Sequence, residues 1–332
     1  MFGRKSLLLM LLVGLSQLSS AADRKAAIRE GASGASIASP VVGYFWSQTD
    51  GIAPIEGVAG AAHVGHALSA TDRVALPPGQ AYAWMESPGG VWFLVLDEVH
   101  GQRTVVSDTV AAATGSDTIS FSPNGSVAVL YFRSSSQVQI VSGLPDSPQG
   151  TVRFRAPQSD CGALAVADDA ATVLLACGGN LYSAAADRVW RPAIPGQVAA
   201  AAFLPGSSDA LAIMTGDAAV YGVSLDSGKS GVRGQLPIGM NDPLSLAVSS
   251  DGRFALAIDG DGNAAQLDLA TSQATLLKVA QGMRTVVRGR DASTFLLLPD
   301  GEGVPWIVEA RPGNPSASFA PRIPPAPGVS QF

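Results

Sequence analysis

The sequence predicts an all-β protein made of repeated antiparallel sheets, and three observations lead to this fold class. Two short apolar runs flank a polar turn at residues 249–252 (Ser-Ser-Asp-Gly), which is the pattern of a β-hairpin. The same pattern returns at residues 122–125 (Ser-Pro-Asn-Gly) and 167–170 (Ala-Asp-Asp-Ala). No stretch keeps a long apolar period of about 3.6 residues with helix caps. We therefore expect very little helix.

The spacing of these turns predicts how the sheets are arranged. Equivalent turn positions recur every 36 to 46 residues, at Gly79, Gly125, Ala170, Gly206, Gly252 and Asp291. A β-rich period of about 40–45 residues is typical of the blades of a β-propeller. The sequence therefore predicts a propeller of four-stranded antiparallel blades.

Six full units are expected, and a spare hairpin precedes them. The units cover about residues 72–106, 117–154, 161–192, 198–236, 244–279 and 284–319. The hairpin has strands at 41–46 and 52–58 and resembles the outer half of a later unit. Either the hairpin forms a partial seventh blade, or six blades close with the hairpin added to the last. Joining the two chain ends removes an unpaired sheet edge, and we favour seven blades with the N-terminal hairpin closing the ring.

The N-terminus has the pattern of a secretory signal peptide. Arg4 and Lys5 precede an apolar run at 6–18, and small residues follow. We predict a signal peptide at 1–21, a flexible leader at 22–40, the propeller at 41–320 and a Pro-rich tail at 321–332. The protein is expected to be extracytoplasmic, either periplasmic or secreted.

The hairpin motifs resemble those of a known group of propellers. Phe-Ser-Pro-Asn-Gly at 121–125 and Val-Ser-Ser-Asp-Gly at 248–252 are similar to the repeats of WD40-like and lactonase-like propellers of exported bacterial proteins. Some relatives in that superfamily are lactonases or quinone-cofactor dehydrogenases. None of their catalytic residues maps onto this chain, so the resemblance implies a scaffold and carries no activity.

The charge balance argues against a nucleic-acid partner. The chain has 21 Lys and Arg against 27 Asp and Glu, a net charge of −6. Cleavage of residues 1–21 would remove Arg4 and Lys5 and make the chain more acidic. Nucleic-acid binding depends on clusters of basic side chains, and the sequence has none. We expect a monomer without a nucleic-acid partner and without a membrane span after signal cleavage.

Three clusters of polar residues are candidates for metal or catalytic sites. Asp259, Asp261 and Asn263 resemble the start of an EF-hand loop, but later ligand positions hold alanine. His63 and His66 lack a third ligand at a suitable spacing. The third cluster lies in a turn that we expect to be exposed to solvent, and it consists of Asp97, Glu98 and His100. We predict no metal site, no cofactor and no catalytic residue.

The sequence favours a non-catalytic propeller that binds a protein, peptide or glycan on one ring face. The alternative is a lactonase-like or quinoprotein-like enzyme at the central channel, which would need several ionisable side chains converging from the innermost strands. For the binding protein, we expect the site on the face formed by links between units. The polar residues of those links are Asp72, Arg73, Asp117, Arg155, Asp160, Asn241, Asp242 and Arg284.

The two cysteines, Cys161 and Cys177, are expected to form a disulfide. They lie equally far from the turn at 168–169, so they should face each other across a hairpin. Export would carry them to a compartment where disulfides persist. Two buried free thiols remain the alternative.

Overall fold

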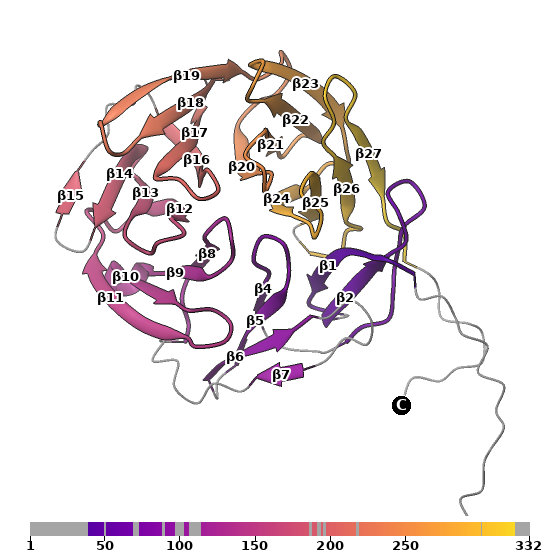
Figure 1. Cartoon of the computed structure of the whole chain (residues 1–332), viewed down its shortest axis with the longest axis horizontal. Helices are drawn as coiled ribbons and strands as arrows, with labels where there is room; N and C mark the ends of the chain where they lie inside the picture. Colours follow the sequence, from indigo (N-terminus) through magenta and orange to yellow (C-terminus); the bar gives the residue numbers. More distant parts are fainter. Residues whose placement is uncertain are drawn as a thin grey trace, which may run out of the picture. The chain divides into compact units, whose positions relative to one another are not determined.

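The computed structural model describes residues 39–49, 51–68, 73–87, 90–96, 103–105, 114–185, 188–190, 194, 197–216, 219–299 and 301–322. Seven antiparallel sheets form a ring, so the fold is a seven-bladed β-propeller (Figure 1). The favoured number of blades is confirmed. The predicted signal peptide, nearly all of the leader and the tail beyond Arg322 lie outside the described residues.

Each sheet is laid down in chain order from the channel outwards. The innermost strands are β4 (Arg73–Ala75), β8 (Thr118–Phe121), β12 (Cys161–Val166), β16 (Gln197–Phe203), β20 (Pro243–Val248) and β24 (Met283–Arg288). The second strands are β5 (Tyr82–Ser87), β9 (Val127–Phe132), β13 (Val173–Cys177), β17 (Asp209–Thr215), β21 (Phe254–Asp259) and β25 (Thr294–Pro299). The third strands are β6 (Gly90–Val95), β10 (Gln137–Ser142), β14 (Asn180–Ala185), β18 (Ala219–Ser224), β22 (Asn263–Asp268) and β26 (Trp306–Glu309). The outermost strands are β7 (Arg103–Val105), β11 (Gln149–Arg155), β15 (Arg188–Trp190), β19 (Lys229–Gln235), β23 (Gln273–Lys278) and β27 (Ser316–Phe319).

Helix is almost absent, as expected. Within the described residues, helical structure is limited to the 3₁₀ turn η1 (Arg133–Ser135). That part of the chain contains no helix of the length and apolarity that crossing a membrane requires.

The second strands are apolar because both faces of each sheet are covered. β13 and β21 are buried along their whole length. Each pair of neighbouring sheets encloses its own apolar cluster, for example Val129, Val138, Leu164 and Leu175 between the sheets of β9 and β13. Clusters of this kind also join the first sheet to its neighbours on both sides. The ring therefore has no open apolar face between sheets.

The first sheet has only three strands, β1 (Val41–Ser47), β2 (Gly51–Glu56) and β3 (His63–Val64). β1 contacts β25, the second strand of the last sheet, and β3 pairs outside β2. The N-terminal hairpin therefore supplies the middle strands of its blade, and the sequence-based match to an outer half was wrong. β3 is too short to give a sequence signal, and the described residues contain no innermost strand for this sheet.

Side chains from neighbouring turns take the place of the missing strand. The buried Gln80 amide accepts a hydrogen bond from the Tyr44 N–H at 2.6 Å and donates one to the Tyr44 carbonyl at 2.9 Å. The Arg290 side chain lies over the Tyr44 ring and donates to the Leu96 carbonyl at 3.2 Å. At the inner edge of β1, the Gln80 side chain thus pairs with Tyr44, and the Arg290 N–H donates to the Val42 carbonyl at 3.4 Å.

The C-terminal end closes the rim of the ring. The Val64 N–H donates to the Pro321 carbonyl at 2.9 Å, and Val64 forms a parallel bridge with Arg322. The Gly60 N–H donates to Ser318 Oγ at 2.9 Å. The last sheet and the first are therefore joined by backbone pairing as well as by apolar packing.

The repeated Ser-x-Asx-Gly turn has a common hydrogen-bond network. Ser122 Oγ donates to Asn124 Oδ1 at 2.9 Å and accepts from the Val127 N–H at 3.2 Å. Ser249 makes the same pair of bonds with Asp251 and the Phe254 N–H. Both serines are fully buried, so their hydroxyls have to be satisfied locally. This need explains why the motif repeats.

The predicted disulfide is present. Cys161 and Cys177 face each other across β12 and β13, with Cα atoms 3.9 Å apart, and their sulfur atoms are bonded. Both residues are buried against the neighbouring sheet. The bond fixes the start of an innermost strand to its partner.

The fourth turn position has positive φ, and Ala170 occupies it without the freedom of glycine. Its φ is 59°, whereas Gly125 and Gly252 have 76° and 70°. An L-residue in this region costs about 1–2 kcal/mol. We expect Ala170→Gly to raise the free energy of unfolding by roughly 0.5–1 kcal/mol in chemical denaturation. The control Ala171→Gly, at the exposed next position without positive φ, should lower it; equal losses in both variants would contradict the strain.

Candidate functional site

The order of strands defines two faces of the ring. On one face lie the links from each outermost strand to the next innermost strand, together with the turns between second and third strands. We call this the link face. On the opposite face lie the turns between innermost and second strands, and we call it the turn face. The central channel runs between the two faces (Figure 1).

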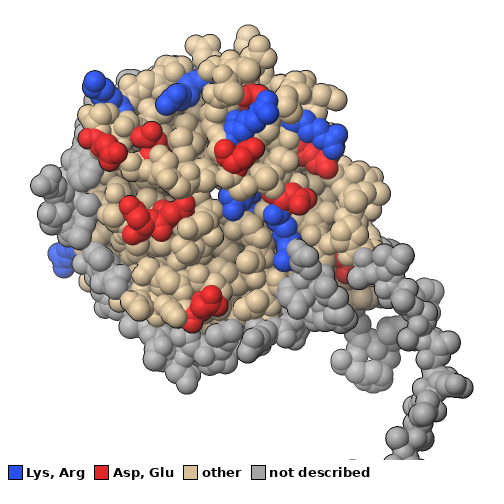
Figure 2. Space-filling model, in the orientation of Figure 1, with Lys and Arg blue, Asp and Glu red and all other residues tan. Residues whose placement is uncertain are grey.

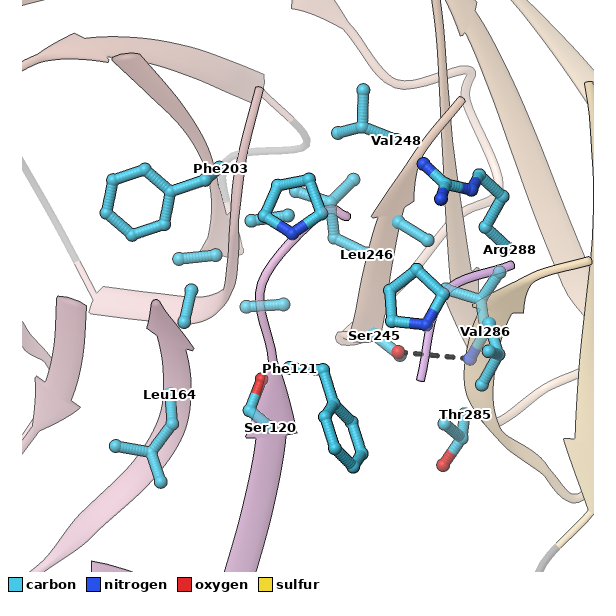
Figure 3. Close-up of a pocket in the computed structure, with 18 of the residues that line it drawn as sticks. Ser120, Phe121, Leu164, Phe203, Ser245, Leu246, Val248, Thr285, Val286 and Arg288 are labelled. Atoms are coloured by element: carbon cyan, nitrogen blue, oxygen red, sulfur yellow. Dashed lines mark hydrogen bonds between the residues drawn. The ribbon is translucent and has the colours of Figure 1, made fainter. Parts of the chain in front are cut away.

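The channel contains a cavity of about 280 Å³ lined by the innermost strands of five sheets and by Leu76 and Pro78 in the turn after β4. Most of its wall is apolar, with Leu164, Phe203, Leu246 and Val286 among the lining residues (Figure 3). Small hydroxyl side chains interrupt this wall, and Ser245 Oγ accepts a hydrogen bond from the Val286 N–H at 3.1 Å. Within the lining, Arg288 is the single ionisable residue found in the described part of the chain.

A β-bulge recurs near the start of the innermost strands. The pairing with the second strand skips one residue in four complete sheets, at Gly162, Ala199, Leu244 and Arg284. A bulge turns a side chain out of the normal alternation. Leu244 and Arg284 are both exposed as a result, at the link-face end of the channel.

The six turns of the turn face form a closed circle of contacts. Asp168 joins three of them, because its carboxylate accepts the Asn124 N–H at 2.8 Å and the Gly206 N–H at 2.9 Å. The remaining contacts are Ser250 N–H to the Ala292 carbonyl, Gly79 N–H to the Arg288 carbonyl, and close packing of Gly125 on Pro77 and of Gly252 on Pro205. This circle fixes the turn-face end of the channel.

The structure brings Arg73 and Asp117 together between two sheets. The Arg73 guanidinium donates to the carbonyls of Ser116 and Asp117 and lies 3.4 Å from the buried Glu86 carboxylate. Asp117 Oδ2 accepts the Arg133 N–H at 2.6 Å. These contacts give both residues a structural role in joining a link to its sheets.

Asn241 and Arg284 lie at the turn between β21 and β22, and Asp242 follows Asn241 in the chain and is exposed. The buried Asp259 carboxylate accepts the Asn241 N–H at 3.1 Å and also bonds three donors of Asp261 and Asn263. A Cβ at Gly260 would lie 3.5 Å from Leu244 Cδ1 and 4.0 Å from Arg284 Nη1. The EF-hand-like stretch is therefore a turn that fixes this link, and the described residues contain no cluster of three possible metal ligands.

The other predicted site residues are dispersed. Arg155 ends the outermost strand β11 and is exposed, away from the channel. Asp160 is exposed before β12, and its carbonyl accepts the Gly178 N–H at 2.9 Å. Asp72 lies outside the described residues. Their role in binding stays a prediction.

Two exposed aliphatic and two exposed charged residues belong to the link into β20 and to the link-face ends of β20 and β24, and we call this set the mouth patch. It consists of Ile238, Asp242, Leu244 and Arg284, of which Leu244 and Arg284 both lie near Gly260. Ile238, on the link into β20, is fully exposed, and Leu244 is 37% exposed. The sequence pointed to the charged members of this patch. It did not point to the apolar ones, because a bulge and a loop conformation expose them.

The charges on the face shown in Figure 2 are mixed. Lys and Arg side chains alternate with Asp and Glu side chains, and no broad region of one sign covers that face. A phosphate backbone is bound by grouped basic side chains. The described residues of this face show no such group (Figure 2).

Fold and channel together define a seven-bladed propeller with an apolar central cavity.

No family model matches the chain, and no curated protein matches it. Among solved structures, a protein of unknown function from Desulfotomaculum acetoxidans is similar, at 16% identity and a TM-score of 0.50 over 69% of this chain and 75% of that one. Hydrazine synthase from Kuenenia stuttgartiensis is similar at 16% identity and a TM-score of 0.46, over 65% of this chain and 69% of that one. At this identity the likeness concerns the fold.

The Asp168 bridge can be tested by substitution. Asp168→Ala removes an acceptor shared by two other turns, and we expect the free energy of unfolding to fall by about 1–3 kcal/mol. The neighbouring Asp169 bonds only within its own turn, to the Ala171 N–H. Chemical denaturation of Asp169→Ala should show a smaller loss, and equal losses would show that the contact between turns adds nothing.

Proposed function

We propose that this protein is an exported binding propeller that holds a peptide segment of a partner protein on its link face, at the mouth patch. The exposure of Leu244 at the channel mouth carries the proposal. The bulge in β20 turns this side chain away from the core, and Ile238 adds a second exposed aliphatic side chain on the same link. Apolar side chains with flanking charges are typical of peptide contacts.

The charges of the mouth patch favour a segment of mixed charge. Asp242 and Arg284 carry opposite charges on neighbouring sheets, so a bound segment would present a basic and an acidic side chain around an apolar one. Charge pairs at the rim of an interface mainly set orientation and specificity.

Four tryptophans pack inside the protein, which argues against a sugar site built on their rings, whereas Phe319 on β27 is 54% exposed. Trp84 belongs to the core between two sheets, and Trp46, Trp92 and Trp306 pack against such clusters. Their rings are thus engaged within the protein.

The channel lining favours binding over catalysis. General acid–base chemistry needs titratable side chains placed against each other. In the described lining, Arg288 is the only ionisable side chain. Export is supported by the signal-like N-terminus and by the disulfide, a bond that persists in oxidising compartments.

A displayed peptide library selected on the full mature chain tests the proposal. Selected peptides should bind the wild type in a fluorescence anisotropy assay and lose about tenfold or more in affinity to Leu244→Asp and Ile238→Asp. Val232→Asp, at an exposed aliphatic position on the outermost strand β19, is the matched control and should bind normally. Failure to select any peptide, with binding on a glycan array instead, would contradict the proposal.

A further inference from the structure

Arg288 lies at the turn-face end of the cavity and is only 9% exposed. Figure 3 shows its side chain beside Val248, apart from Thr285 and Ser120. Within the described residues its guanidinium donates no hydrogen bond and forms no ion pair. Its carbonyl, by contrast, accepts the Gly79 N–H, so the backbone at this position is fixed.

The nearest opposite charge does not satisfy this cation. Asp168 attracts Arg288 electrostatically, but its two carboxylate oxygens are occupied by the N–H groups of Asn124 and Gly206. Burial lowers the pKa of Arg288 while Asp168 raises it. An arginine remains protonated in proteins, so Arg288 brings a cation with five N–H donors to the cavity lining.

A buried charge normally has hydrogen-bond acceptors around it. The guanidinium fork matches a carboxylate, which can accept two parallel hydrogen bonds from it. The unused donors of Arg288 therefore point to an anionic oxygen ligand inside the channel.

The other lining residues and the size of the cavity indicate the polarity and length of the rest of the ligand. Leu164, Phe203, Leu246 and Val286 line the space between the two ends with apolar surface. The volume of about 280 Å³ is near the lower end of ligand pockets. From Arg288 to Thr285 the strand advances about 10 Å, at about 3.3 Å per residue. A short apolar chain fits this length.

We propose that the channel binds a monocarboxylate with a short apolar body, whose carboxylate pairs with Arg288. The acid can be a free aliphatic acid or the carboxyl terminus of an apolar peptide. The cavity and the mouth patch share Leu244, but the carboxylate is held at the opposite end of the cavity by Arg288, which is not part of the mouth patch. Substitution of Arg288 therefore tests this site, whereas Ile238→Asp tests the mouth patch outside the cavity. Failure of carboxylate binding and failure of peptide binding at the mouth can therefore be told apart.

Isothermal titration of the full mature chain with hexanoate tests the proposal. We expect saturable binding, with hexanamide weaker by about tenfold or more because it lacks the charge. Arg288→Gln should weaken hexanoate by a similar factor, and Arg288→Lys, which keeps the charge without the fork, should weaken it less. Arg233→Gln, on the exposed outermost strand β19, is the control and should bind like the wild type.

A second set of probes distinguishes a free aliphatic acid from the carboxyl terminus of a peptide as the ligand. An acetylated apolar tripeptide with a free carboxyl terminus is compared with hexanoate and with the same tripeptide as a C-terminal amide. Tighter binding of hexanoate assigns the site to free acids, and tighter binding of the peptide acid assigns it to carboxyl termini.

Three results would overturn the proposal. One is the absence of hexanoate binding at millimolar concentration in folded wild type. Another is an equal affinity of the Arg288 variants and Arg233→Gln for hexanoate. The third is inorganic phosphate or acetate binding as tightly as hexanoate, which would show that the apolar wall contributes nothing. If Arg288→Gln fails to fold, Arg288→Lys decides the second point.

Discussion

Closure of the ring depends on one side chain, which pairs with a strand edge where the other sheets have an innermost strand. In the part of the chain that the structure describes, the first sheet has three strands, and the Gln80 amide pairs with both backbone groups of Tyr44 at its inner edge. An amide carries a donor and an acceptor in the geometry of a peptide group, so it can continue a backbone ladder by one step. Gln80 belongs to the turn after β4, so this pairing links the second sheet to the first. The neighbouring Gly79 N–H donates to the Arg288 carbonyl and links the second sheet directly to the last sheet.

Closing this gap shapes the channel. Six innermost strands surround a space in a ring of seven sheets, and their turns touch in a complete circle on the turn face. Asp168 and Arg288 both take part in that circle, the first through its side chain and the second through its carbonyl. The position of the buried Arg288 cation is thus a consequence of how the ring closes. On the opposite face, bulges turn Leu244 and Arg284 outwards, so the two ends of the channel differ in chemistry.

Much of the fold could be predicted from the sequence, because local rules determine it. The turn residues predict the bounds of the six complete units to within a few residues. The equal distance of Cys161 and Cys177 from their turn predicts the disulfide. The site was less accessible. A bulge leaves the alternation of apolar residues almost unchanged, so the exposure of Leu244 was not visible in the sequence. Gln80 and Arg288 gain their roles from residues far away in the chain, and a single sequence contains no sign of those contacts.

The most direct test of this account is the free energy of unfolding of Gln80→Ala. Removing the amide removes the hydrogen bonds that the buried N–H and carbonyl of Tyr44 make with Gln80, each at a cost of about 1–3 kcal/mol. The account predicts a loss of about 2–5 kcal/mol in urea denaturation, against less than about 0.5 kcal/mol for the exposed Gln273→Ala. If the two variants lose the same small amount, Gln80 does not close the ring.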